Sequence, residues 1–138
     1  MASVQQWNKT IASLGKWYGQ EKAKNKALQD KINALENAKR ILRDALNAAE
    51  SMNKHAKKVK IGDRWKGKLA KQARSAKKTG VSTSSNICGD IKAGISDLQH
   101  HVNKLRAQQN DLVKLMSKIE GRIENARIER ARERAKQS

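Results

Sequence analysis

Apolar residues recur at alternating steps of four and three along the second half of this 138-residue chain. Such spacing places side chains on one stripe of an α-helix, and its persistence over about five heptads is typical of a helix that packs against another helix. We therefore expect a helix over about 84–135, which begins at the capping sequence Ser-Thr-Ser-Ser-Asn at 82–86 and ends in a basic segment. The stripe, in which only Gln109 is polar, comprises Ile91, Ile95, Leu98, Val102, Leu105, Gln109, Leu112, Met116, Ile119, Ile123 and Ala126.

The first half of the chain repeats this pattern with more interruptions, and we expect a helix over about 4–56. At a rise of 1.5 Å per residue this helix would be about 80 Å long. Glu21, Asn25 and Lys39 interrupt the stripe, and such polar positions in coiled coils set the register or face water. The remaining members are Trp7, Ile11, Leu14, Tyr18, Leu28, Ile32, Leu35, Leu42, Leu46 and Ala49.

Composition supports an all-α fold without a thick core. The chain has no proline and no phenylalanine, and it is rich in residues that favour helices over strands. Neither helix can bury its stripe alone, so the two are expected to pair antiparallel. The sequence predicts one domain over 1–138, an elongated, coiled-coil-like antiparallel two-helix hairpin: a first arm at about 4–56, a tip at 57–66 and a second arm at about 66–135.

The sequence between the two stripes predicts a turn and then a second helix. Gly62 and Asp63 are good turn formers, and Asp63 is a candidate N-cap. Apolar and small residues suggest a helix from near Trp65 to about residue 78, followed by a break or kink at 79–86. Gly67 is expected to leave room for a neighbouring group. Trp65 is expected to pack against the end of the first helix, where the candidates are Met52, His55, Ala56, Val59 and Ile61.

Positive charge is concentrated in the same region. The net charge of the chain is +18, and residues 58–80 contribute nine basic residues against one acid. Such a patch favours an anionic partner, whether nucleic acid, acidic lipid or an acidic protein surface, and a solvated face is the simplest alternative. Its basic residues are Lys58, Lys60, Arg64, Lys66, Lys68, Lys71, Arg74, Lys77 and Lys78.

No pattern in the sequence indicates a catalytic, metal or cofactor site, so we expect neither an enzyme nor a bound cofactor. The spacing of Cys88, His55, His100 and His101 matches no compact zinc pattern. A thin two-helix protein offers no enclosed pocket for catalytic groups. No apolar run approaches the roughly 18 residues of a membrane span, and the first residues lack the apolar core of a Sec signal.

The connection between the stripes carries a resemblance to a known family. The pattern Gly62-x-x-Trp65-x-Gly67-x-x-Ala70, preceded by a long Lys-rich segment and followed by "IKAGISDL", resembles the small WxG-motif proteins of type VII secretion in Gram-positive bacteria. It is most similar to the helical accessory proteins associated with LXG-type toxins. The resemblance implies a turn at Gly62, Trp65 and Gly67, and a non-catalytic chaperone or targeting partner. It further implies binding to the helical N-terminal domain of a toxin, with a second small helical accessory protein as a further partner.

The resemblance also bears on localisation. Members of the broader family carry a Tyr-x-x-x-Asp/Glu export signal after the second helix, whereas the end of this chain has no aromatic residue and Tyr18 lies in the first helix. We expect a protein of the bacterial cytoplasm that is chaperone to, or exported with, a partner that supplies the signal. Two other classes stay open: a basic nucleic-acid-binding protein and a self-associating coiled coil that forms a homo-oligomer. Exposure of Trp7, Trp17 or Tyr18 would mark an interface.

Overall fold

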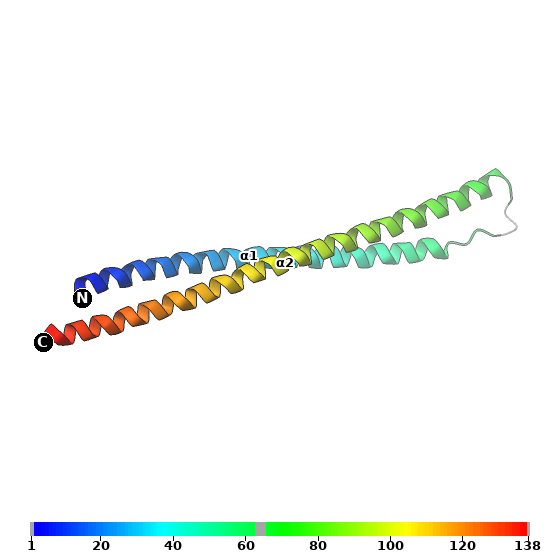
Figure 1. Ribbon diagram of the computed structural model, residues 1–138. Helices are drawn as coiled ribbons and strands as arrows, with labels where there is room; N and C mark the ends of the chain where they lie inside the picture. The colour runs from blue at the N-terminus through cyan, green and yellow to red at the C-terminus, as the bar shows by residue number, and fades with distance from the viewer. Residues whose placement is uncertain (1, 63–65, 138) are drawn as a thin grey trace. The chain divides into compact units, whose positions relative to one another are not determined.

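The computed structural model of the chain describes residues 2–62 and 66–137. It contains two helices, α1 from Val4 to Lys58 and α2 from Lys68 to Gln137. The helices run in opposite directions and pack against each other, so that the start of α1 lies beside the end of α2 (Figure 1). The predicted all-α antiparallel hairpin is therefore confirmed.

The chain divides into two compact units, each built from parts of both helices. Unit 1 comprises Met1–Asn33 and Asn103–Ser138, and unit 2 comprises Ala34–Val102. Unit 2 contains the connection between the helices, and unit 1 contains both ends of the chain. Each unit has its own seam of packed side chains between the two helices.

In unit 1 the register between the helices is marked by two side-chain hydrogen bonds. Arg130 Nη1 donates to Asn8 Oδ1 at 3.1 Å, and Gln109 Nε2 donates to Gln29 Oε1 at 2.9 Å. In both pairs the residue numbers add to 138, as they must when two antiparallel helices keep one register. The core of this unit is narrow, and its buried apolar members are Leu14, Ile32, Ile119 and Ala126.

Unit 2 is held in register in the same way. Ser84 Oγ donates to Asn53 Oδ1 at 2.7 Å, and Lys39 Nζ donates to Gln99 Oε1. The helices approach closely at Gly94, where an added Cβ would lie 3.4 Å from Leu42 Cδ1. The buried apolar members of this unit are Ala70, Cys88 and Val102.

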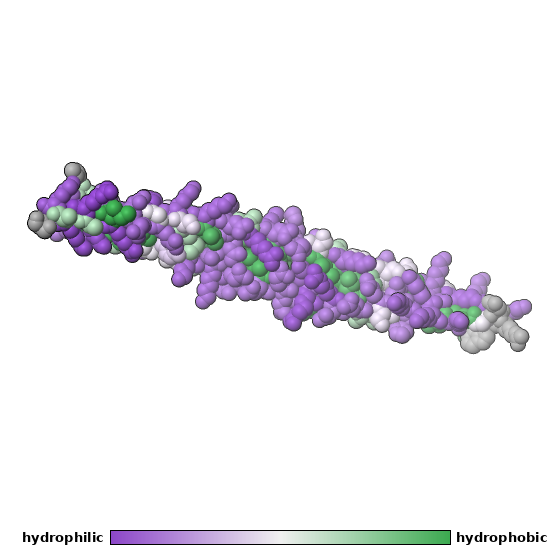
Figure 2. Space-filling model, turned by 90° about the horizontal axis from the view of Figure 1, so that it is seen from below, coloured by the Kyte–Doolittle hydropathy of each residue, from purple (hydrophilic) through white to green (hydrophobic). Residues whose placement is uncertain are grey.

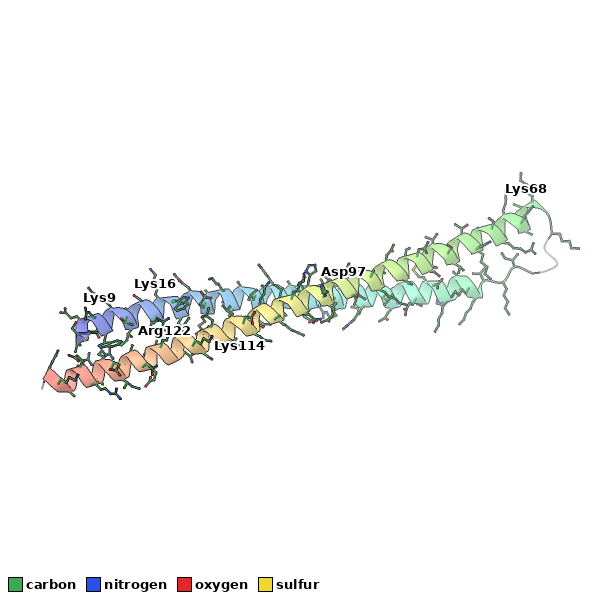
Figure 3. The ribbon with its side chains drawn as sticks, viewed as in Figure 1. Lys9, Lys16, Lys68, Asp97, Lys114 and Arg122 are labelled. Atoms are coloured by element: carbon green, nitrogen blue, oxygen red, sulfur yellow. The ribbon has the colours of Figure 1, made fainter. Side chains whose placement is uncertain are left out.

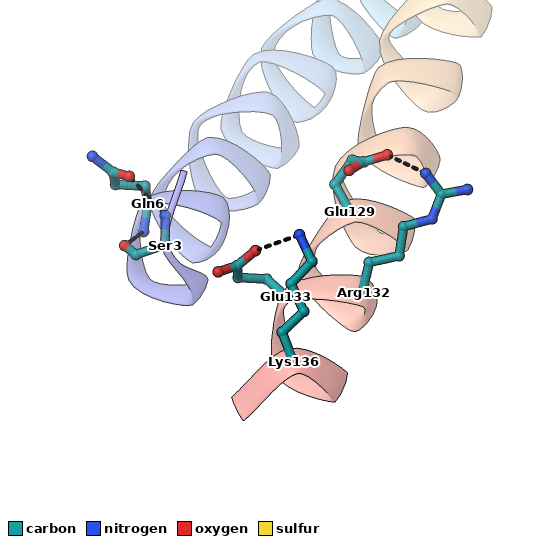
Figure 4. A network of polar contacts seen from close by, with 6 residues as sticks. All are labelled: Ser3, Gln6, Glu129, Arg132, Glu133 and Lys136. Atoms are coloured by element: carbon teal, nitrogen blue, oxygen red, sulfur yellow. Dashed lines mark hydrogen bonds and ion pairs between the residues drawn. The ribbon is translucent and has the colours of Figure 1, made fainter. Parts of the chain in front are cut away.

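A capping box begins α1. The Ser3 hydroxyl accepts from the backbone N–H of Gln6 at 3.2 Å, and the Gln6 side chain accepts from the backbone N–H of Ser3 at 2.7 Å (Figure 4). This reciprocal pair satisfies two N–H groups that have no partner inside the helix. The pattern Ser-x-x-Gln at residues 3–6 carries this signal in the sequence.

The predicted break at 79–86 is wrong, because α2 is helical throughout this segment. Hydroxyl groups favour turns when they compete with the helix for backbone partners. Here the single hydrogen of the Ser84 hydroxyl has three acceptors within reach: the carbonyl oxygens of Gly80 at 2.9 Å and Val81 at 3.2 Å, and Asn53 Oδ1 on α1 at 2.7 Å. The hydroxyl is thus satisfied within a continuous helix, and packing against α1 supports the segment.

The helix α2 begins at Lys68, and Gly67 occupies the position directly before it. The Gly67 carbonyl accepts the first helical hydrogen bond, from Lys71 N at 3.1 Å, and its φ is +93°. Glycine is favoured here for its backbone conformation. Among the described residues no atom lies within 4 Å of a Cβ added at Gly67. The expectation that Gly67 leaves room for a neighbouring group therefore stays a prediction. Asp63, Arg64 and Trp65 lie outside the described residues, and the packing of Trp65 stays a prediction.

Two glycine substitutions are expected to have opposite effects. Gly80→Ala should raise the free energy of unfolding by about 0.5–1 kcal/mol, because Gly80 lies inside a continuous helix and no atom would meet the new Cβ. Gly67→Ala should lower it by about 1 kcal/mol or more, because alanine is strained at positive φ. Urea unfolding followed by circular dichroism measures both, and a loss of stability in Gly80→Ala would contradict the continuous helix.

Candidate interaction surfaces

Each apolar residue predicted to pack between the helices lies buried or half-buried in the structure. The C-terminal stripe continues towards the start of α2 at the same alternating spacing, through Ser84 and Cys88. This extension was missed because its members are small or polar. The residues of the predicted stripes are Trp7, Ile11, Leu14, Leu28, Ile32, Leu35, Leu42 and Leu46 on α1, with Ile91, Ile95, Leu98, Val102, Leu105, Leu112, Met116, Ile119 and Ile123 on α2.

Two charged residues sit inside the seams. Glu21 and Lys39 are each only 5% exposed. Glu21 is paired with Lys24 at 3.0 Å, and Lys39 Nζ lies 3.2 Å from Glu36 Oε2 and also bonds Gln99. Because both side chains are buried, they do not face water. Of the two roles expected for polar residues in the stripe, Glu21 and Lys39 therefore fit the setting of the helix register.

Unit 1 carries an open groove along one flank of its seam. The groove has a volume of about 510 Å³. Its lining combines four apolar residues with four polar or charged ones. It is lined by Lys24, Ala27, Leu28 and Lys31 from α1 and by Gln108, Asp111, Leu112 and Leu115 from α2.

The aromatic residues of α1 also lie in unit 1. Trp7, Trp17 and Tyr18 are half-buried rather than exposed. The guanidinium of Arg122 lies 5.8 Å from the centre of the Trp17 ring, which is within range of a cation–π interaction worth about 0.5–1 kcal/mol at a surface. These rings therefore contribute to packing between the helices and carry no independent sign of an interface.

Tyr18 shares a second groove of unit 1 with Glu120. A hydrogen bond to Glu120 raises the pKa of the Tyr18 hydroxyl above its ordinary value of 10.0, and desolvation and the charge of Glu120 act in the same direction. The protonated hydroxyl is the form that this contact favours. Its contribution to stability is therefore complete below pH 10 and is lost as the pH rises through the folded-state pKa.

This shift is directly measurable, because Tyr18 is the only tyrosine of the chain. Titration of the tyrosinate absorbance should give a midpoint above 10.0 in the native protein. Glu120→Gln should bring the midpoint back towards the ordinary value, since it removes the carboxylate. Glu133→Gln, a change at another acid of α2, should leave it in place. A native midpoint at or below 10.0 would contradict the contact.

The basic patch lies on unit 2, around the connection and the first turns of α2. Its described members are exposed except Lys77, which is half-buried, and Arg64 lies outside the described residues. Arg74 Nη2 donates to the carbonyl of Gly62 at 3.2 Å and so ties α2 to the connection. In Figure 3 the side chain of Lys68 extends away from the start of α2. The exposed members are Lys58, Lys60, Lys66, Lys68, Lys71, Arg74 and Lys78.

The four residues considered as metal ligands differ in their exposure to solvent. Cys88 is a free, buried thiol, whereas His55, His100 and His101 are exposed. Within residues 2–62 and 66–137, no group of three or more histidine, cysteine and acidic side chains is arranged to hold a metal. In the same ranges, neither helix has a stretch apolar enough to cross a membrane.

Comparison with known proteins gives no match to a family model, to a curated protein or to a solved structure. The type VII resemblance therefore rests on the motif residues alone. Independently of this resemblance, the structure shows two grooves in unit 1 and an exposed basic patch on unit 2. Polar and charged side chains cover most of the face drawn in Figure 2, with apolar patches between them.

Proposed function

We propose that this chain is a non-catalytic interaction protein that binds another helical protein along its hairpin. One observation carries the proposal: two helices leave most of the seam incompletely covered. Val102 and Ile119 are the largest described side chains that are fully buried, while most other seam residues are half-buried. Additional helices packed alongside, as in a four-helix bundle, would bury this remaining apolar surface.

In its finer form, the proposed partner is the helical N-terminal domain of an LXG-type toxin of type VII secretion, and the chain is its chaperone or targeting partner. The support is the motif of Gly62, Trp65 and Gly67. In agreement with the resemblance, its two glycines lie between two long antiparallel helices. A second small helical accessory protein belongs to the same proposal. The expected location is the bacterial cytoplasm, with export only alongside the partner.

Light scattering on the purified full chain tests the proposal. The chain is mixed with the helical domain of an LXG toxin encoded beside its gene, and the mass of the mixture is compared with those of the two components. A stable complex of defined mass supports the proposal. A chain that keeps its own mass in the presence of this domain contradicts the finer form, and a defined homo-oligomer that ignores the partner favours the self-associating coiled coil.

A second function, binding of nucleic acid, is favoured by the seven exposed basic residues of the patch. Contacts with several phosphates would give an affinity that falls steeply with salt. Mobility shift assays with duplex and single strands at near-physiological salt distinguish this function from general charge attraction. Tight, length-dependent binding there would favour it, whereas binding only at low salt would not.

A further inference from the structure

Beside the seam of unit 2, α1 carries a second apolar stripe that is open to solvent. Its members again alternate in steps of four and three, so they share one face of the helix. All but Ala38 are exposed, and the two large side chains, Ile41 and Met52, are 57% and 69% exposed. The stripe comprises Ala34, Ala38, Ile41, Ala45, Ala48 and Met52.

The helix α2 carries a matching stripe in the same unit. Leu69 and Ile87 are its large members, 78% and 47% exposed. The residues between them are small, which leaves the surface shallow and allows close approach of another helix. The stripe comprises Leu69, Ala73, Ala76, Gly80, Thr83 and Ile87.

Both stripes lie on the same side of the seam. They occupy the heptad positions that, in unit 1, line the groove between Ala27 of α1 and Leu115 of α2. In an antiparallel pair these positions of the two helices face the same side. A groove of about 410 Å³ at the connection includes three members of the α2 stripe and is lined by Ala56, Val59, Ile61, Ala73, Ala76, Lys77 and Gly80. We call this surface of unit 2 the apolar flank.

The side of the seam opposite the apolar flank is mostly polar and charged. Along α1 it presents Glu36, Arg40, Arg43, Asn47, Glu50 and Lys54. Along α2 it presents Lys78, Ser82, Ser85, Gly89, Lys92 and Ser96. Lys92 Nζ lies 3.8 Å from Glu50 Oε1 across this side. A hairpin that worked alone would need no such difference, because both sides would face water.

We propose that the apolar flank is the docking site of an acidic amphipathic helix of another protein. The proposal rests on the proposed function, helix binding, and names the surface and the partner chemistry. The charge of the surrounding chain favours an acidic partner, because residues 54–78 contain eleven basic residues and one acid. Lys77 lines the groove itself, and Lys60, Lys66 and Lys68 are exposed around the connection. A helix that buries large apolar side chains on the flank would place its acids against these cations.

A second copy of the chain fits this surface less well. It would bring another +18 protein against the same basic region, and like charge opposes association. An acidic helix gains both from burial of apolar surface and from opposite charge. The partner is therefore a different chain.

Binding of synthetic peptides to the full chain tests the inference. The probe is an acidic peptide about four heptads long, with leucine at the apolar positions and glutamate around them. One control peptide has the same composition in scrambled order, and the other has lysine in place of glutamate. Fluorescence anisotropy at near-physiological salt should detect binding of the patterned acidic peptide and at least about tenfold weaker binding of both controls. Equal binding of the scrambled acidic peptide would overturn the docking site, because charge alone would then suffice.

Matched variants locate the binding surface. Ala48→Glu and Ile87→Glu place a charge on the apolar flank and should weaken binding of the acidic peptide by about tenfold or more. Asn47→Glu and Ser85→Glu add the same charge to exposed positions on the opposite side of the same helices, and should change the affinity little. All four positions are exposed, so the fold should tolerate the changes, which circular dichroism verifies. Equal losses in both pairs would overturn the assignment.

The same variants separate this inference from the function on which it rests. If the chain binds a toxin helical domain and the flank variants bind it as well as the native protein, the proposed function stands and the docking site is wrong. If the native protein binds no toxin domain but binds the patterned peptide at the flank, the docking site stands and the toxin is the wrong partner. A native dimer that Ile87→Glu converts to a monomer would show a second copy as the occupant and overturn the proposed partner.

Discussion

Ile119→Ala should lower the free energy of unfolding by about 2–5 kcal/mol. Ile119 is fully buried in the seam of unit 1, and removal of its side chain loses burial and leaves a cavity. A narrow seam has few neighbouring side chains that can move in to fill the space. Equilibrium unfolding in urea, followed by circular dichroism, gives the change in free energy.

Val113→Ala is the matched control on the same helix. Val113 is 48% exposed, so its truncation should cost well under about 1 kcal/mol. If the two variants lost equal stability, the burial of Ile119 between the helices would be contradicted.

Lys39→Leu should raise the free energy of unfolding of unit 2 by about 1–3 kcal/mol while weakening the specificity of the helix register. The Lys39 side chain is buried, and its ammonium group must be held by Glu36 and Gln99. Removal of one partner of a fully buried ion pair destabilises a protein, but the Glu36 side chain is 36% exposed and so stays solvated without the lysine. The change therefore removes the cost of burying the Lys39 charge, whereas a polar seam residue restricts register and oligomeric state. Urea unfolding and sedimentation velocity measure the two effects.

Lys54→Leu is the control for this change. Lys54 is exposed and lies on the opposite side of unit 2 from the apolar flank, so leucine there should alter neither register nor assembly state. A loss of stability in Lys39→Leu, with a single species in solution, would show that the contacts of Lys39 outweigh the cost of burying its charge.

The hairpin could be predicted because its signal is periodic and long. The stripe from Ile91 to Ala126 repeats often enough that no single residue decides it, and the absence of proline removes the strongest helix breaker. The start of α2 was harder to place. Ser84 and its neighbours have poor helix propensity, whereas in the structure the helix continues through them and Ser84 contacts Asn53 of α1.

The surfaces were less predictable than the fold. Ile41 and Met52 belong to an apolar stripe that no sequence motif marks, and the stripe residues between them, Ala45 and Ala48, are small. The periodic stripe of the apolar flank can be recognised only after the first stripe has been assigned to the packed seam between the helices. The burial of Glu21 and Lys39 was equally hidden, because a charged residue in a heptad can set the register or face water.

The reactivity of the buried Cys88 thiol can be used to measure how often the two helices of unit 2 separate locally. Cys88 is the only cysteine of the chain and is 7% exposed within the seam, so a thiol reagent must wait for the helices to separate locally. When closing is faster than labelling, the labelling rate gives the free energy of that opening in the native protein. A helix docked on the apolar flank would slow the reaction by mass action, and the native cysteine reports this without any engineered residue.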